Sequence, residues 1–392
     1  MKPMKLLLVG LLVGSALPAW ALDQLVEKKT FEMPSYTTLG GKTIRDVKVG
    51  YESYGTLNTA KDNVVVIPHF FSANSHVAGR YKADDKLPGY WDAIVGPGKP
   101  LDTDKYFIIG VDSLCNINTK DGVTVTTGPA SLDPATGKPY GMSFPVVGIG
   151  DFVNVQKALL DSLGIKKLHA VMGASMGAIQ SWDWAARYPD MVERLVSVVG
   201  TPWLDAYGVL VMQSWADPIM LDPNWNHGDY YGKAEPLDGL ALAFKLVNYQ
   251  ARQPAWAREA FGRKWAEAAK DPAQAWGNQY AVEKWQDDAS RARAKLSDAN
   301  NFICLARANA LFVLGGRPSV EEGLKAVKAK VLLLPDHRDL LLFPDYSREA
   351  GELLKAQGNK VEYLELEGNL GHLDGVVGIS QASERIAKFL TE

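Results

Sequence analysis

Several features that mark common functional classes are scarce in this sequence. The 392 residues contain two cysteines, Cys115 and Cys304, no CxxC pair and no HExxH motif. Histidines with the spacing of metal ligands are also lacking, so we predict no metal site and no cofactor. Two cysteines could form one bridge in an oxidising compartment, but their spacing does not establish it. We therefore expect two buried free thiols, with a single disulfide as the alternative.

Neither sign of charge is in excess. The chain has 42 Lys and Arg residues against 45 Asp and Glu residues, and no basic block stands out. This balance argues against nucleic acid and anionic membrane surfaces as partners. No apolar run of 18 residues follows residue 21, so we expect no membrane association once the leader is removed.

The first 21 residues have the composition of a signal peptide. Lys2 and Lys5 precede an apolar stretch from Leu6 to Leu17, which is too short to span a bilayer comfortably. Ala19 and Ala21 place small residues at the two positions that a signal peptidase requires, which predicts cleavage after Ala21. An uncleaved N-terminal anchor is the alternative. Cleavage would leave a periplasmic or secreted protein.

Short apolar runs alternate with helical patterns along most of the chain. Several runs are apolar throughout, as strands buried on both faces of a parallel sheet are. The predicted strands are Val64 to Ile67, Tyr106 to Val111, Leu168 to Met172, Leu195 to Val199, Val331 to Leu334 and Val361 to Leu366. Val47, Val49 and Tyr51 alternate with polar residues, which predicts a half-exposed antiparallel edge strand.

Helices are expected between these strands. Asp151 is placed to cap a helix whose apolar residues follow at helical spacing until Gly164. A second helix follows Ser175 and runs to about Tyr188, and a closing helix spans Ile379 to Phe389. The alternation predicts an α/β fold, with a mostly parallel central sheet flanked by helices.

Residues 201–318 break this alternation because they contain no convincing strand. They hold seven tryptophans, with Ala, Arg, Glu and Lys between them. We interpret this segment as a helical lid over the carboxyl edge of the sheet, and residues 22–200 and 319–392 as the core domain. Most of the tryptophans are expected to pack helices together, and the basic residues to form a solvated face.

The strongest local signal is the GxSxG motif from Gly173 to Gly177. It directly follows an apolar strand and directly precedes a helix. In that context it indicates a nucleophile elbow, a strained turn whose glycines keep side chains away from the crowded backbone. Ser175 is therefore the predicted nucleophile, and it needs a base within hydrogen-bond reach.

The base is expected late in the chain, since the order in this type of site is serine, acid, histidine. His372 lies in a polar loop after the last predicted strand, whereas His337 stands too close to the preceding strand and His169 lies within one. His372 is therefore the predicted base. Among the acids after the fifth predicted strand, Asp339 is favoured because the apolar residues that follow would shield a carboxylate orienting the imidazole. Asp336 is the second choice.

An oxyanion hole requires two backbone N–H groups near the serine. One is expected from Met176, the residue after the nucleophile. The other is expected from the loop that follows the strand at 64–67, where Phe71 is the candidate.

The chain resembles the homoserine O-acetyltransferase (MetX-like) branch of the α/β-hydrolases from about residue 39 to 390. The matching segments are GYWD at 89–92, IVGPGKPL at 94–101, TGPASLDPATGKPY at 127–140, FPVV at 144–147, DFV at 151–153, GASMGAIQ at 173–180, DANNFI at 298–303, Asp339 to Pro344, Ser347-Arg348-Glu349 and Gly371-His372. The resemblance implies an α/β-hydrolase fold and a triad of Ser175, Asp339 and His372. It also implies that the insertion is a lid that forms a homodimer contact and walls a tunnel to the serine.

Two positions depart from the family pattern. Phe244 stands where the family has a lid arginine that grips the substrate carboxylate, and Leu373 stands where an aspartate follows the histidine. Loss of such a charged contact typically costs about 1.5–3 kcal/mol of binding, which argues against homoserine as substrate. Together with Phe70, these residues predict an apolar pocket for a small-molecule ester.

These observations predict a serine hydrolase that cleaves a carboxylic ester through an acyl-serine intermediate. The alternative is an O-acyltransferase that passes the acyl group to a small alcohol or amino acid such as homoserine, because both reactions share the acyl-enzyme. A third possibility is a non-catalytic binding module, which a failure of Ser175 to react with a fluorophosphonate probe would favour.

Overall fold

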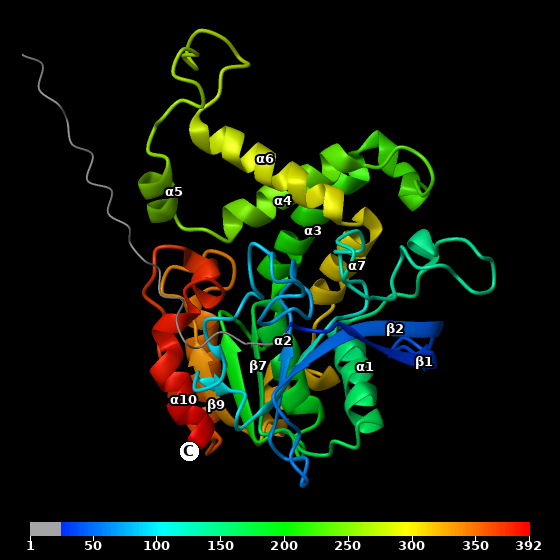
Figure 1. Cartoon of the computed structure of the whole chain (residues 1–392), viewed down its shortest axis with the longest axis vertical. Helices are drawn as coiled ribbons and strands as arrows, with labels where there is room; N and C mark the ends of the chain where they lie inside the picture. Colours follow the sequence, from blue (N-terminus) through cyan, green and yellow to red (C-terminus); the bar gives the residue numbers. More distant parts are fainter. Residues whose placement is uncertain (1–24) are drawn as a thin grey trace, which may run out of the picture.

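The computed structural model describes residues 25–392, so the predicted signal peptide lies outside the described residues. An eight-stranded sheet forms the centre, in the order β1-β2-β6-β3-β7-β8-β9-β10 (Figure 1). Its strands are β1 (Lys29–Thr37), β2 (Thr43–Tyr54), β3 (Val64–Pro68), β6 (Phe107–Val111), β7 (Ala170–Ala174), β8 (Arg194–Val198), β9 (Lys330–Leu334) and β10 (Val361–Tyr363). A separate pair consists of β4 (Val95–Gly96) and β5 (Leu101–Asp102).

The sheet is parallel from β6 to β10 and antiparallel at its other end. β1 pairs with β2, and β2 with β6, in antiparallel register. The predicted antiparallel strand is β2, but it lies one strand in from the edge, because β1 covers it. β1 escaped the sequence pattern because it is largely exposed, so its residues show little apolar alternation.

Helices cover both faces of the sheet. The helices of the described chain, of which α3 to α7 belong to the segment 201–318, are α1 (Ile149–Ser162), α2 (Met176–Arg187), α3 (Ala206–Leu221), α4 (Leu237–Gln250), α5 (Pro254–Ala260), α6 (Ala281–Leu296), α7 (Ala299–Ala310), α8 (Val320–Ala326), α9 (Pro344–Ala356) and α10 (Ser383–Thr391). Asp151 is not the cap of α1 but its third residue, and its carboxylate accepts the N–H of the cap residue Gly148 at 2.8 Å. The acid therefore closes the helix start from inside the first turn.

Alternate residues of each central strand enter two separate cores. Val64 and Val66 of β3 belong to the core that includes Phe152 of α1, whereas Val65 and Ile67 belong to the core that includes α10. Burial on both faces explains why these strands read as continuous apolar runs.

Residues 201–318 contain α3 to α7 and none of the strands of the described chain (Figure 1). Phe71, three residues after β3, packs its ring 5.3 Å from Trp215 of α3, so this helical segment lies over the carboxyl edge of the sheet. Trp215 is buried, whereas the Trp276 side chain is fully exposed. No helix between residues 25 and 392 has both the length and the apolar content needed to cross a bilayer.

Cys115 and Cys304 form a disulfide, so the expectation of two free thiols is wrong. Cys115 follows β6 and Cys304 lies on α7, and folding brings their Cα atoms to 6.1 Å although 189 residues separate them in sequence. Packing of α7 beside the loop after β6 sets this distance, and the spacing of two residues in sequence carries no information about it.

Loss of this bridge should weaken the fold. A cross-link that closes so long a loop restricts the unfolded chain, and removing one typically costs about 2–5 kcal/mol. We expect the Cys115→Ser/Cys304→Ser variant to unfold at lower urea concentration than the oxidised wild type. A reducing agent should lower the unfolding midpoint of the wild type and leave that of the variant unchanged. Coinciding midpoints for oxidised wild type and variant would contradict a stabilising bridge.

Candidate active site

Ser175 stands at the sharp turn between β7 and α2. Its backbone has φ 56° and ψ −124°, a left-handed conformation that costs a residue with a side chain about 1–3 kcal/mol. Its N–H donates to the Val198 carbonyl of the neighbouring strand at 3.0 Å, which holds the turn at the sheet edge. The predicted elbow is thus present as a strained strand-turn-helix.

Three glycines permit this turn. A Cβ at Gly173 would overlap the backbone of Gly177, and one at Gly177 would overlap the Pro68 carbonyl. A Cβ at Gly200 would overlap the side chain of Ala178 in α2. The elbow therefore packs directly against the end of β3 and against the loop after β8.

Asp339 and His372 meet although 33 residues separate them. Asp339 lies after β9, and His372 lies in the 3₁₀ helix η4 (Gly371–Gly375). His372 Nδ1 lies 2.6 Å from Asp339 Oδ2, and Asp339 Oδ1 accepts the N–H groups of Leu341 and Leu342 at 2.8 and 3.0 Å. Both side chains are buried. Because a carboxylate only accepts, Nδ1 carries the hydrogen, and in the neutral form of the ring Nε2 then has the lone pair.

The backbone of η4 places His372 beside the end of β8. Gly375 packs against Val199 and the Val198 side chain, and its carbonyl accepts the indole N–H of Trp91 at 3.1 Å. Since Val198 also accepts the Ser175 N–H, the serine turn and the histidine turn share one strand end. His372 Nε2 is buried and has no hydrogen-bond partner among residues 25–392, so the structure does not join it to the Ser175 hydroxyl. Such contacts are often long in unliganded enzymes.

Phe71 and Met176 occupy the positions predicted for the two oxyanion donors. Neither N–H donates to another residue of the described chain. His69 shapes the loop that carries Phe71, because its Nδ1–H donates to the Phe70 carbonyl at 2.8 Å while its Nε2 accepts the Ser113 N–H at 3.0 Å. Burial lowers the pKa of His69 to about 4, so the ring stays neutral and keeps both roles.

Two further residues hold this loop, and neither is a site residue predicted from the sequence. Gln180 of α2 donates its amide to the His69 carbonyl at 3.2 Å. Arg293 of α6 donates to the Ser72 carbonyl and to Asn118 Oδ1, the latter at 2.8 Å. Burial lowers the pKa of Arg293, so the expectation that basic residues of the helical segment form a solvated face is wrong for this one.

The three predicted pocket residues have different surroundings. Phe244 is buried, with its ring 5.5 Å from Phe302, which in turn lies 5.0 Å from Phe71. Phe70 is half-buried against Tyr90, and Leu373 is half-buried beside His372 in η4. Phe244 therefore supports the loop after β3 that carries Phe71, through aromatic contacts that pass by way of Phe302.

The chain is similar to known enzymes over nearly its whole length. The family model described as alpha/beta hydrolase fold matches residues 88–375. Homoserine O-acetyltransferase from Symbiobacterium thermophilum is 39% identical over 90% of this chain and 91% of its own. The chain therefore belongs to the homoserine O-acetyltransferase family of the α/β-hydrolases. It is an α/β-hydrolase enzyme, of the esterase or acyltransferase kind.

Solved structures of both kinds resemble this family member. The crystal structure of esterase E22 has a TM-score of 0.89 and 48% identity, and covers 93% of this chain and 100% of its own. Homoserine O-acetyltransferase from Bacillus anthracis has a TM-score of 0.90 and 38% identity, over 94% of this chain and 98% of its own. Membership alone therefore leaves the acyl acceptor open.

Asp336, the second choice for the acid, does not contact the histidine in this family member. One oxygen accepts the Arg338 N–H at 2.9 Å and the other is buried without a hydrogen-bond partner in the described chain. Burial, followed by the negative charges of Asp374 and Asp339, raises the pKa of Asp336 to about 6. Asp374 accepts the Leu370 N–H at 2.7 Å, so these acids brace the two loops.

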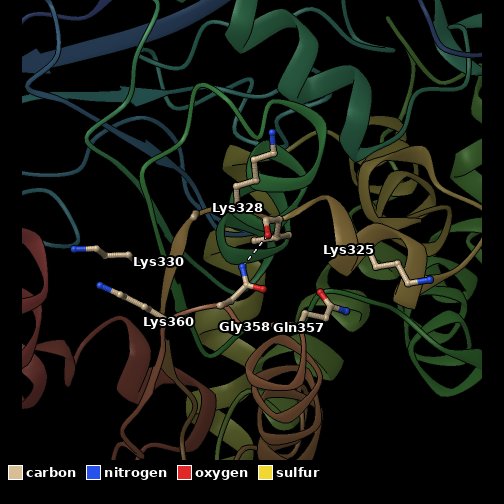
Figure 2. Close-up of a pocket in the computed structure, with 9 residues that line it drawn as sticks. Lys325, Lys328, Lys330, Gln357, Gly358 and Lys360 are labelled. Carbon is tan, nitrogen blue, oxygen red and sulfur yellow. Dashed lines mark hydrogen bonds between the residues drawn. The ribbon is translucent and has the colours of Figure 1, made fainter.

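A cavity of about 550 Å³ lies at the opposite, amino-terminal edge of the sheet, where β9 and β10 begin (Figure 2). Lysines surround it, but Lys328 pairs with Asp190 and Lys325 with Glu322, each within the same protein. The elbow lies at the other end of the strands. Of the four lysines that line the cavity, Lys360 forms no ion pair within the described chain. It has no part in the chemistry at Ser175.

The raised pKa of Asp336 predicts a pH-dependent stability. The protonated carboxyl is favoured in the fold, so its contribution is complete below the ordinary value of 3.8 and is lost as pH rises through about 6. Asp336→Asn should therefore raise stability by about 1–3 kcal/mol at pH 8 and change it little at pH 4.5.

Melting temperatures at both pH values measure this difference. Asp84→Asn, at an exposed loop position, serves as the control and should show no such pH-dependent gain. An equal shift of Asp336→Asn at pH 4.5 and pH 8 would contradict the assignment.

Proposed function

We propose that this protein is a carboxylester hydrolase that works through an acyl-serine intermediate. The observation that carries the proposal is the buried Asp339–His372 pair, which engages Nδ1 of the ring and leaves Nε2 without a partner in the described chain, beside the elbow that presents Ser175. A serine hydroxyl is a weak nucleophile, and such a base supplies the activation that it lacks.

The reaction then proceeds in two halves. Ser175 Oγ attacks the ester carbonyl carbon while His372 Nε2 takes its proton, and the Phe71 and Met176 N–H groups stabilise the oxyanion. His372 returns the proton to the leaving alkoxide, which departs as the alcohol. Water gives its proton to the same nitrogen as it attacks the acyl-serine carbonyl carbon. The bond from that carbon to Ser175 Oγ breaks, His372 returns the proton to Oγ, and the carboxylic acid is released.

Water is favoured over an amino acid as acceptor because of Phe244 and Leu373. Phe244 is an uncharged, buried ring, and Leu373 offers no charge beside His372. Neither side chain can hold the charged groups of homoserine. The 48% identity to an esterase, against 38% to an acetyltransferase of solved structure, supports the same acceptor. Transfer to homoserine remains the second candidate, because the acetyltransferases match over the same length.

Two further segments, residues 1–21 and residues 201–318, have proposed roles in export and assembly. We infer that residues 1–21 direct export to the periplasm or beyond, and that the helical segment 201–318 acts as the lid and the contact in a homodimer. Mass spectrometry of the secreted protein would give the cleavage site, and light scattering the mass in solution.

Replacement of Ser175 should abolish ester cleavage. With p-nitrophenyl butyrate, Ser175→Ala is expected to lower kcat by three or more orders of magnitude at unchanged melting temperature, because the acyl-enzyme can no longer form. Ser181→Ala, a buried serine of the same helix whose hydroxyl only donates to the Gly177 carbonyl, is the matched control. Equal turnover by wild type and Ser175→Ala would end the proposal.

Partitioning of the acyl group tests the acceptor. With p-nitrophenyl acetate and homoserine together, the wild type should release free acetate as its main product. Leu373→Asp places a carboxylate beside the site and should raise the share of O-acetylhomoserine. Predominant transfer to homoserine by the wild type would favour the acyltransferase instead.

A further inference from the structure

A second cavity lies where the helical segment meets the loops of the proposed site. It has a volume of about 410 Å³, within the range of small-molecule sites. Most of its lining comes from the end of α4, from α5 and from the start of α6, and Figure 1 shows where these helices lie in the fold. Its lining is mostly apolar and consists of Asn248, Tyr249, Arg252, Gln253, Pro254, Trp256, Ala257, Arg258, Val282, Trp285, Gln286 and Leu340.

The cavity contains an arginine that lies against two indole rings, whose centres are themselves 4.9 Å apart at an interplanar angle of 60°. The Arg252 guanidinium carbon lies 4.8 Å from the ring centre of Trp256 and 4.9 Å from that of Trp285. Its Nη1 donates to the carbonyl and the side-chain oxygen of Asn248, at 3.0 and 3.2 Å. The rings and Asn248 thus hold the guanidinium at one wall of the cavity. Its Nε and Nη2 donate to no residue of the described chain, and these are the donors that a carboxylate binds.

No acid in the described part of the chain neutralises Arg252. No carboxylate of residues 25–392 forms an ion pair with it, and burial lowers its pKa without an opposing acidic neighbour. The cavity lining holds a second arginine, Arg258, and neither Asp nor Glu. A partly buried cation without a counterion is costly, so an external anion would gain from binding here.

The cavity shares walls with both loops of the acid–histidine pair. Leu340 lines it and directly follows Asp339. Gln253 also lines it, and its side-chain amide donates to the Gly368 carbonyl at 2.7 Å, while its backbone nitrogen lies 3.1 Å from where a Cβ of Gly371 would stand. A ligand in this cavity would therefore lie against the loops that carry Asp339 and His372.

We propose that Arg252, Trp256 and Trp285 bind a carboxylate on an apolar or aromatic body. Resting on the proposed function, this assigns the substrate class: esters that carry a second, free carboxylate, such as monoesters of aromatic dicarboxylic acids. Hydrolysis needs only water beyond such a substrate, and it yields the alcohol and a dicarboxylate.

Binding is measured first, in a protein that cannot turn the ester over. Monoethyl terephthalate and ethyl 4-carbamoylbenzoate have the same shape and differ in one negative charge. By calorimetry on the Ser175→Ala protein, the anion should bind at least about tenfold more tightly than the neutral amide. Added Arg252→Gln should remove that preference, and Arg252→Lys should retain part of it, because a lysine keeps the charge without the planar fork.

Arg263→Gln is the matched control. Arg263 also covers an aromatic ring, that of Tyr280 at 4.9 Å, and donates to its hydroxyl, but it does not line the cavity. This variant should keep the full preference for the anion. Melting temperatures show which variants fold, and Arg252→Lys carries the test if Arg252→Gln does not.

Kinetics with active enzyme then separates the two proposals. The ratio of kcat/KM for the anionic over the neutral ester should fall at least about tenfold in Arg252→Gln and stay unchanged in Arg263→Gln. Selective binding without turnover of any ester would defeat the hydrolase and leave the site intact. Equal binding of anion and amide, or a preference unchanged in Arg252→Gln, would overturn the site even in an active esterase. If Arg252→Gln changed only the oligomeric state, from dimer to monomer, then Arg252 would pair with a carboxylate of a second copy of the chain. That result would also overturn the proposed site.

Discussion

The structure depends on a close approach of backbones at the carboxyl edge of the sheet. β7 ends in a turn that touches the Pro68 carbonyl at the end of β3 and donates the Ser175 N–H to the Val198 carbonyl at the end of β8. Such an approach leaves no room for side chains, and Gly173 and Gly177 supply the space. The same contact positions the loop that carries Phe71, so the nucleophile and the proposed oxyanion donors are placed by one packing constraint.

At this edge, two buried acids, Asp339 and Asp336, lie in the loop after β9, and one of them contacts His372, the proposed base. One oxygen of Asp339 accepts two backbone N–H groups and the other contacts His372, so both oxygens of this buried side chain have partners within the protein. Asp336 stands close by, and burial, followed by the charges of Asp374 and Asp339, raises its pKa, so its protonated form is favoured here.

The helical segment contributes more than cover. Arg293 reaches from α6 to the Ser72 carbonyl, and Phe244 of α4 continues through Phe302 to Phe71, so two contacts tie the segment to the oxyanion loop. Movement of these helices would therefore change the position of the loop that carries Phe71, one of the proposed oxyanion donors. The cavity around Arg252 lies at the same junction, which would let a bound anion influence the loops of Asp339 and His372.

The sequence alone determined the parallel strands, the elbow at Ser175 and the choice of Asp339 and His372 as a pair, because these depend on local patterns and chain order: buried apolar runs, a GxSxG turn between strand and helix, and an acid followed by apolar residues. It did not find β1, the Cys115–Cys304 bridge, or the contacts of His69, Arg252 and Arg293. These depend on which distant segments pack together. An exposed strand has no burial pattern, and a buried arginine looks like a surface one until its neighbours are known. Only the tertiary structure decides them, because burial and partnership are properties of contacts between segments and not of any one segment.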